Sequence, residues 1–381
     1  MKGVYVDHAA ATPVAREVVA AMQPFLSEKF GNPSSFHGMG VEAREAVEDA
    51  RVRVAKVLHA RPSEMIFTSG GTESVNLAVL GAVRSLKQKG NHMITSSVEH
   101  ESVLEACNYA KRAEGVKVTY VPVDKQGRVD VADVERAITP QTVLVSVMYA
   151  NNEVGTIQPV KEIGKIARKQ KVLFHTDACQ AGLLDLDVRE LGVDLLTLNG
   201  SKLYGPKGVG MLYKREGVPL VPLVFGGGQE FGVRSGTENV PGIVGFARAL
   251  ELVQVSRGEE LKRLWELRKL LVDGVQEKVS GVTVYGHSSE VLPSHVSLGC
   301  KEVDADALLV MLNENGVYAA AGSACASRKE SVSHVLRAMG VRGREADGVI
   351  RLTFGRETSR EDMFRVVEII AKSVKELRGE R

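Results

Sequence analysis

The apolar positions of the chain fall into short continuous runs that alternate with longer stretches of helical periodicity. Residues that are apolar at consecutive positions are typical of strands buried on both faces. The runs that predict strands are 65–67, 92–96, 116–121, 143–148, 172–176, 195–198 and 209–213, and helical stretches between them include 75–86, 102–112 and 160–169. This alternation predicts an α/β fold with a mostly parallel sheet flanked by helices, which places its site at the C-terminal ends of strands.

The pattern changes after Gly226-Gly227-Gly228. A long charged helix is predicted over about 242–278, with a bend near Arg257-Gly258, and a final helix over 359–378. Near the N-terminus, residues 1–13 predict a strand and a turn, and 14–25 and 41–58 predict helices. We therefore expect a large domain over 14–255 and a smaller α+β domain formed by 1–13 and 256–381.

Composition excludes several classes of protein. The chain has 381 residues and a net charge of +2, so no electrostatic pattern favours nucleic acid or an anionic membrane. No apolar run reaches transmembrane length, and no secretory signal precedes the first strand. The four cysteines show no zinc-ligand spacing, so we expect no metal site. Few cysteines in a long chain indicate a reducing compartment, which for this chain predicts a cytoplasmic location.

Lys202 lies in a turn between two apolar runs, in the sequence Asn199-Gly200-Ser201-Lys202-Leu203-Tyr204-Gly205. This places its side chain at the end of a buried strand, where an ammonium group is costly unless it is neutralised. One solution is an imine with an aldehyde cofactor. The alternative, an ordinary solvated loop lysine, is not excluded by this stretch alone.

A second candidate segment, 68–74, joins a predicted strand to a predicted helix. Its small residues, including Gly71 and Thr72, suit a phosphate at the helix N-terminus, although an ordinary helix cap would have the same composition. The segment is not a Walker loop, because no lysine follows its last glycine.

Other polar residues at strand ends could contact a flat cofactor. Asp177 could pair with a cationic ring nitrogen, as expected for pyridoxal phosphate, and Gln180 could donate to a phenolate oxygen. His100, at a strand-to-helix junction, could stack on a ring or move protons. Asp177 could instead be a solvated loop acid, and His100 an ordinary structural or surface residue.

Two residues of the C-terminal part have features of reactive or binding groups. Cys325 is flanked by small residues and followed by Arg328-Lys329, which favours a lowered thiol pKa, so it is the cysteine predicted to be reactive. Arg351 begins an apolar stretch and could bind a carboxylate through two hydrogen bonds, although a surface ion pair is an equal alternative.

Several stretches match a known pattern in the same order along the chain. They are Phe67-Thr68-Ser69-Gly70-Gly71-Thr72-Glu73-Ser74, Glu99-His100, Ala150-Asn151-Asn152-Glu153-Val154-Gly155, Tyr204-Gly205-Pro206-Lys207-Gly208, Arg234-Ser235-Gly236-Thr237 and Gly322-Ser323-Ala324-Cys325. Together they resemble the cysteine desulfurases of the IscS/NifS branch of the class V aminotransferase-like, pyridoxal-phosphate-dependent family. The resemblance covers essentially the whole chain and implies a fold-type-I transferase with pyridoxal 5′-phosphate as cofactor.

The resemblance also implies a role for each matching residue. Lys202 would be the Schiff-base lysine, His100 would stack on the ring and shuttle protons, and Cys325 would be the nucleophile that takes the sulfur. Thr237 would reach the cofactor of a partner subunit, which implies a homodimer. The implied cofactor contacts are Gly71, Thr72, His100, Asn152, Asp177, Gln180, Asn199, Ser201, Lys202 and Thr237, and the implied substrate contacts are Asn152, Arg351 and Asn32.

The implied reaction converts L-cysteine to L-alanine, with the sulfur held as a persulfide on Cys325 for a sulfur acceptor or an iron–sulfur scaffold protein. A selenocysteine lyase or an aminotransferase on the same fold is an alternative. A degenerate, non-catalytic scaffold is another, because Asn199-Gly200-Ser201 precedes Lys202 where the family usually has Ser-Gly/Ala-His.

Overall fold

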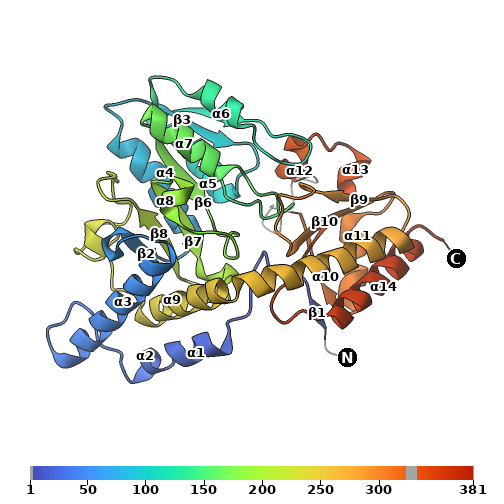
Figure 1. Cartoon of the computed structure of the whole chain (residues 1–381), viewed down its shortest axis with the longest axis horizontal. Coiled ribbons are helices and arrows are strands. Elements are labelled where there is room, and N and C mark those ends of the chain that lie inside the picture. The colour runs from blue at the N-terminus through green and yellow to red at the C-terminus, as the bar shows by residue number, and fades with distance from the viewer. Residues whose placement is uncertain (1–2, 323–332, 381) are drawn as a thin grey trace.

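The computed structural model describes residues 3–322 and 333–380. Its centre is a seven-stranded sheet in the order β2-β8-β7-β6-β5-β3-β4 (Figure 1). Neighbouring strands from β7 to β4 are parallel, whereas β8 runs antiparallel to both β2 and β7. The strands are β2 (Met65–Thr68), β3 (His92–Ser96), β4 (Lys117–Val121), β5 (Thr142–Ser146), β6 (Leu173–Asp177), β7 (Leu195–Asn199) and β8 (Gly210–Lys214). The prediction of a mostly parallel sheet is confirmed.

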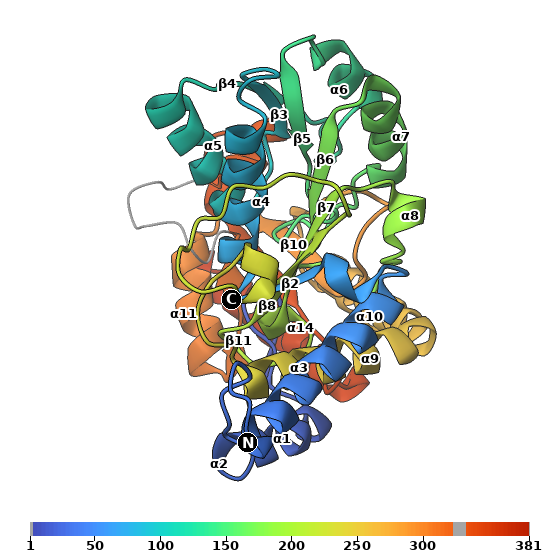
Figure 2. The same cartoon turned by 90° about the vertical axis from the view of Figure 1, so that its left-hand side faces the viewer.

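Helices cover both faces of this sheet, which explains the continuous apolar runs. Consecutive strand residues enter different cores: Met93 packs with α4 and α5, and Ile94 packs on the opposite face. Figure 2 shows the sheet between α4 and α5 on one side and α7 and α8 on the other. The helices of this part are α1 (Arg16–Met22), α2 (Pro24–Ser27), α3 (Gly38–Val57), α4 (Gly71–Ser85), α5 (Glu101–Glu114), α6 (Val131–Ala137), α7 (Val160–Gln170), α8 (Val188–Leu191) and α9 (Val240–Val255).

The C-terminal part contains a second, antiparallel sheet in the order β12-β13-β10-β9. A separate apolar core fills the space between this sheet and its long helices. β1 (Val4–Tyr5) pairs with β11 (Val317–Tyr318), so the start of the chain packs on the C-terminal core. The other elements are β9 (Val282–Tyr285), β10 (His295–Cys300), β12 (Ala320–Ala321), β13 (Val349–Thr353), α10 (Arg257–Lys278), α11 (Ala305–Glu314), α12 (His334–Ala338), α13 (Arg344–Asp347) and α14 (Arg360–Leu377).

Two predicted helices are interrupted. The long helix consists of α9 and α10, which meet at Ser256, one residue before the predicted bend (Figure 1). The prediction of one continuous helix over 14–25 is wrong, because α1 ends at Met22 and α2 begins at Pro24. Proline lacks a backbone N–H and is tolerated only in the first turn of a helix, so it starts a new one here.

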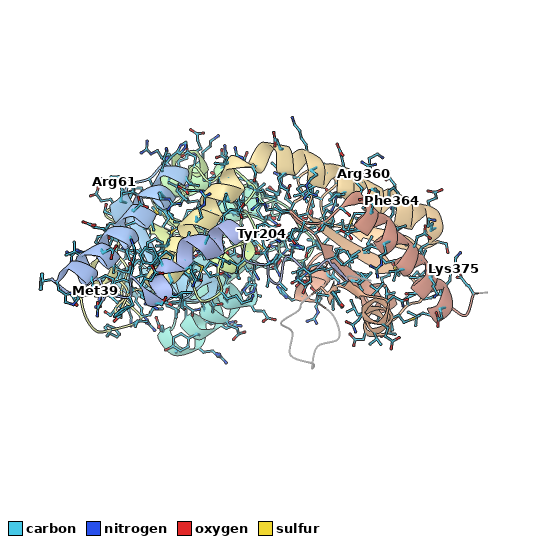
Figure 3. All side chains as sticks on the ribbon, turned by 90° about the horizontal axis from the view of Figure 1, so that it is seen from below. Met39, Arg61, Tyr204, Arg360, Phe364 and Lys375 are labelled. Atoms are coloured by element: carbon cyan, nitrogen blue, oxygen red, sulfur yellow. The ribbon has the colours of Figure 1, made fainter. Side chains whose placement is uncertain are left out.

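Tyr204 lies where the two parts of the chain meet (Figure 3). Its N–H donates to Thr12 Oγ1 at 2.8 Å, and its hydroxyl accepts the N–H of Arg356 at 2.9 Å. The turn that contains Lys202 is therefore tied to both the N-terminal segment and the C-terminal part. None of the helices in the described ranges combines the length and apolarity needed to cross a membrane.

Candidate active site

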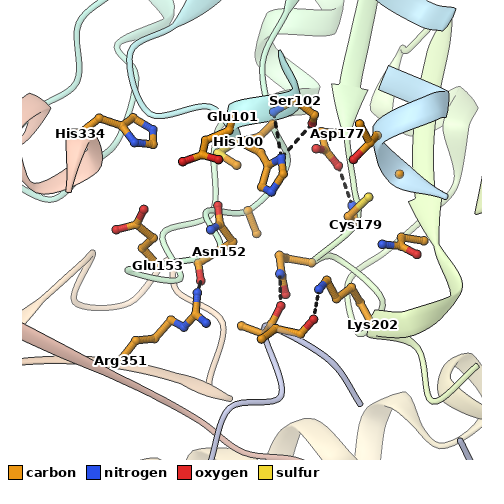
Figure 4. A pocket seen from close by; sticks show the side chains of 18 residues that line it. His100, Glu101, Ser102, Asn152, Glu153, Asp177, Cys179, Lys202, His334 and Arg351 are labelled. Atoms are coloured by element: carbon orange, nitrogen blue, oxygen red, sulfur yellow. Dashed lines mark hydrogen bonds between the residues drawn. The ribbon is translucent and has the colours of Figure 1, made fainter. Parts of the chain in front are cut away.

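A cavity of about 280 Å³ lies at the carboxyl ends of β5, β6 and β7, where they face the N-terminal segment and β13 (Figure 4). The two parts of the chain both contribute to its wall. This is the position expected for a site in a parallel α/β sheet, because the chain diverges at the strand ends and leaves a crevice.

Lys202 ends a single 3-10 turn, Gly200–Lys202, which directly follows β7. The neighbouring Ser201 and Leu203 are buried and fix the turn, whereas the Lys202 side chain lines the cavity. Its ammonium group donates a hydrogen bond to the carbonyl oxygen of Ala10. The turn therefore directs an amine into the cavity between the two parts of the chain, as a cofactor lysine requires.

Residues 9–12 form one side of the lysine environment. The N–H of Thr12 donates to Ser201 O at 2.9 Å, and Gln180 Nε2 donates to Ala9 O at 3.1 Å. These contacts join positions more than 160 residues apart in the sequence. Local sequence pattern does not predict them, because they depend on how the N-terminal segment passes between the two parts.

Asp177 is the last residue of β6, and its carboxylate is buried at the edge of the cavity. Its Oδ1 accepts the N–H of Cys179 at 3.0 Å. Burial, with the nearby negative charge of Asp177, raises the pKa of the Cys179 thiol well above its ordinary value. Cys179 is therefore protonated at neutral pH, and Asp177 offers the cavity an acceptor suited to a cationic ring nitrogen.

The N-terminus of α4 opens into the same cavity at Gly71 and Thr72. Its N-cap, Gly70, has no side chain that could cap the first-turn N–H groups, so these groups are available to an anion. A Cβ at Gly71 would lie 2.8 Å from Cys179 Sγ and 3.4 Å from Asn199 Cβ. The absence of a side chain at position 71 lets the helix start approach the strand ends closely, which forms a cradle for a phosphate.

His100 is the N-cap of α5, and its ring points into the cavity (Figure 4). The N–H of Ser102 donates to Nδ1 at 3.1 Å, and Ser102 Oγ lies 2.8 Å from the same nitrogen. Because Nδ1 accepts the backbone hydrogen bond, the proton of the neutral ring is on Nε2. This geometry fixes both the orientation of the ring and the nitrogen that carries its proton.

Arg351, on β13, faces the sheet ends from the opposite wall. Its Nη2 donates to Asp7 Oδ1 at 2.8 Å, and its Nη1 donates to the carbonyl oxygens of Asn152 and Gly322 at 3.1 and 3.3 Å. The side chain is 2% exposed. Within residues 3–322 and 333–380, no hydrogen-bond partner reaches its Nε. A buried guanidinium donor of this kind is suited to a ligand carboxylate.

Glu153 and Glu99 are two further buried carboxyl groups near the cavity. Burial raises the pKa of Glu153, although the Ser333 hydroxyl and the charges of His334 and Arg351 oppose that shift. Burial raises the pKa of Glu99 to about 8, although its Oε1 accepts hydrogen bonds from Ser96 Oγ and Met148 N.

Most residues predicted for the site line this one cavity. They are Gly71, Thr72, His100, Asn152, Asp177, Gln180, Asn199, Lys202 and Arg351. Ser201 is buried within the lysine turn, and its N–H donates to Asn199 Oδ1 at 3.3 Å. Asn32 and Thr237 are exposed and do not line the cavity of this chain. Cys325 lies outside the described residues.

Sequence reasoning assigned no role to several residues of the cavity wall. They include Ala9, Ala10, Glu101, Ser102, Met148, Glu153, Cys179 and His334. For Glu153 a signal existed, because it belongs to the motif over 150–155. Ala9 and Ala10 belong to the stretch 7–13, with which the family resemblance begins, whereas for His334 we find no signal, since long-range packing brings it to the cavity.

The wall can hold an anion at the start of α4, a ring cation at Asp177, an aldehyde at Lys202 and a carboxylate at Arg351. These groups fit pyridoxal phosphate and an amino acid substrate. No group of His, Cys, Asp and Glu side chains in the described part of the chain has the arrangement of a metal site.

Comparison with known proteins gives a consistent result along the whole chain. The model of the family described as "Aminotransferase class-V" matches residues 4–366. The chain is 46% identical over 376 residues to "Cysteine desulfurase IscS" of Dictyoglomus turgidum, covering 98% of this chain and 95% of that protein. Among solved structures, it is similar to a "NifS-like protein" (TM-score 0.91, 40% identity, 97% of this chain and 98% of the other). It is also similar to "SspA in complex with cysteine" (TM-score 0.82, 36% identity, 92% and 99%). With a family match of this length, the chain belongs to the class-V aminotransferase family.

Proposed function

We propose that the protein is a pyridoxal-phosphate-dependent cysteine desulfurase that converts L-cysteine to L-alanine and holds the sulfur as a persulfide on Cys325. The observation that carries this proposal is that Lys202, Asp177 and Arg351 line one cavity. The names of the relatives support it, since one is a cysteine desulfurase and one solved neighbour is a complex with cysteine.

The cofactor would be held by residues of the sheet side. Lys202 would bind it covalently through the side-chain amine, and the N–H groups at Gly71 and Thr72 would hold the phosphate. Asp177 would keep the ring nitrogen protonated, and Gln180 and Asn199 would contact the ring from the strand ends. When bound, pyridoxal phosphate supplies an electron sink that stabilises negative charge at the substrate α-carbon.

The substrate would be oriented by the opposite side of the cavity. Arg351 Nε would donate to the carboxylate of L-cysteine, and Asn152 would contribute from the adjacent loop. His100, whose Nε2 carries the proton, would move a proton near the ring. The Cys325 thiolate would attack the substrate sulfur, so that a sulfur–sulfur bond forms as the Cβ–S bond breaks. The overall balance is one enzyme thiol and L-cysteine giving one enzyme persulfide and L-alanine.

We also propose a homodimer. Large apolar side chains are exposed in the loop between α2 and α3 and in the segment after β8, including Phe30, Phe36 and Phe225 at 68%, 95% and 80%. Both segments lie at the left-hand end of the molecule in Figure 1. Thr237, in the same segment between β8 and α9, is also exposed. A second copy on this face would bury the apolar groups and bring Thr237 toward the partner's cofactor.

Three expectations extend this proposal. The domain division at 14–255, with 1–13 and 256–381 as the smaller domain, is supported by the separate apolar cores of the two parts. A sulfur acceptor or an iron–sulfur scaffold protein would receive the persulfide sulfur. A cytoplasmic location would suit free thiols, and Cys107, Cys179 and Cys300 form no disulfide.

The decisive experiment adds L-cysteine and dithiothreitol to the purified protein reconstituted with pyridoxal phosphate. For the wild type we expect equimolar L-alanine and sulfide. For Cys325→Ser we expect neither product. The cofactor absorbance of this variant should match that of the wild type before L-cysteine is added and should still change after its addition. Turnover by Cys325→Ser at the wild-type rate would exclude the persulfide role. Activity that requires an α-keto acid and survives the substitution would indicate an aminotransferase instead.

A further inference from the structure

Glu153 has no role in the proposed chemistry, yet its position is tightly fixed. It follows β5 in a turn whose N–H groups at Glu153 and Val154 both donate to Asn151 Oδ1, at 2.8 and 3.0 Å. Its side chain is 2% exposed and reaches the cavity wall. A buried carboxylate is costly unless its partners compensate for lost hydration, so these partners indicate what it does.

One partner stands at the C-terminal end of the segment 323–332, which contains Cys325. Ser333 Oγ donates to Glu153 Oε2 at 2.5 Å. Ser333 Oγ also accepts the N–H groups of Val335 and Leu336, at 3.1 and 3.3 Å, as the N-cap of α12. A hydroxyl has one proton and two lone pairs, so these three contacts use the whole hydrogen-bonding capacity of Ser333. Its one O–H donates the hydrogen bond to Glu153.

The other end of that segment meets the same carboxylate. A Cβ at Gly322 would lie 2.8 Å from Glu153 Oε2, so the carboxylate occupies the space that a side chain would need. The carbonyl oxygen of Gly322 accepts from Arg351 Nη1 at 3.3 Å. Glu153 therefore lies between Gly322 and Ser333, next to the arginine proposed to bind the substrate.

We propose that Glu153 is a positioning residue for sulfur transfer, whose carboxylate binds Ser333 and packs against Gly322, the two residues that flank the Cys325 segment, beside the arginine proposed to bind the substrate. This inference rests on the proposed function. It assigns Glu153 to the step in which the Cys325 sulfur bonds to the substrate sulfur and the Cβ–S electron pair returns to carbon. Cofactor binding and the first response to substrate do not depend on it.

The test uses reconstituted full-length protein and measures three quantities: cofactor absorbance, the rate of its change on adding L-cysteine, and the rate of persulfide formation with alanine release. For Glu153→Ala we expect the first two to stay within about twofold of wild type and the third to fall roughly 10- to 100-fold. Glu153→Gln keeps an oxygen that accepts from Ser333, so we expect a smaller loss. Persulfide formation at the wild-type rate in Glu153→Ala would overturn the proposal.

A comparison of two serine variants, Ser333→Ala and Ser359→Ala, keeps the proposal testable if Glu153→Ala folds poorly. Ser333→Ala removes the hydroxyl that binds Glu153, whereas Ser359→Ala removes an equivalent N-cap, on α14, whose Oγ accepts the N–H of Asp362 at 3.0 Å. Both variants lose the side-chain cap of a helix. Only Ser333→Ala is expected to slow persulfide formation, and equal rates in the two variants would overturn the proposal. Failure of the proposed function is distinct, because wild-type protein would then show no response to L-cysteine.

Discussion

The two walls of the cavity are built in different ways. The sheet wall, comprising Gly71, Thr72, Asp177 and Lys202, consists of residues at the ends of regular elements. The arginine wall, comprising Asn152, Glu153 and Arg351 together with the adjoining Gly322 and Ser333, is held by single hydrogen bonds between segments distant in the sequence. Arg351 alone joins Asp7, Asn152 and Gly322.

This difference separates two kinds of functional dependence. Asp177 is placed by β6 and Lys202 by the turn after β7, so we expect substitution of either to remove a chemical group without moving the rest of the wall. Residues of the arginine wall hold one another, so we expect substitution of one to displace its neighbours as well. We therefore expect loss of chemistry on one side and weakened binding or transfer on the other.

The largest expected effect is at Lys202. Lys202→Ala removes the amine proposed to bind the cofactor, so alanine formation should fall by roughly four orders of magnitude or more, with loss of the visible absorbance of the bound cofactor. Lys207→Ala, which changes an exposed lysine five residues along, is the control and should behave as wild type. Retention of both activity and absorbance in Lys202→Ala would contradict the role of the sheet wall.

A smaller effect is expected on the opposite wall. Arg351→Lys keeps the positive charge but loses the planar donors, so KM for L-cysteine should rise about 30-fold, which corresponds to about 2 kcal/mol. Steady-state kinetics over a range of L-cysteine concentrations measure this change, with kcat falling less than KM rises. The exposed Arg360→Lys on α14 is the control. An unchanged KM would mean that Arg351 serves only its contacts with Asp7 and the backbone.

The same comparison explains how much the sequence could predict. Asp177, Lys202 and the start of α4 follow apolar runs, so the strand pattern indicates their position and the parallel sheet brings them to one edge. The antiparallel direction of β8 and the break at Pro24 concern pairing and helix continuity, which periodicity describes poorly. His334 reaches the cavity through a tertiary contact with the distant Glu99, which leaves no local signal.

Glu99 links β3 and the loop after β5 to the start of α12, and its substitution is expected to have the smallest effect. Its side chain accepts from Ser96 and Met148 on the sheet side, and its carbonyl oxygen accepts from His334 Nε2 at 2.9 Å. Burial raises the pKa of its carboxyl group from 4.5 to about 8. In that pH range the folded state binds a proton that the unfolded state has lost, so this group's contribution to stability decreases as pH rises.

Glu99→Gln replaces the protonated acid with a neutral group of similar shape and removes this pH dependence. The wild type should therefore lose stability relative to the variant by up to about 1.4 kcal/mol per pH unit between pH 5 and 8. Thermal unfolding at pH 6, 7, 8 and 9 should show the Tm of Glu99→Gln gaining on wild type by roughly 2 °C per pH unit, then levelling off. The exposed Glu105→Gln on α5 should show no such trend. If the Tm difference between wild type and Glu99→Gln did not change with pH, the Glu99 carboxyl group would be ionised over the whole range. Glu99 would then be a buried carboxylate in the folded protein.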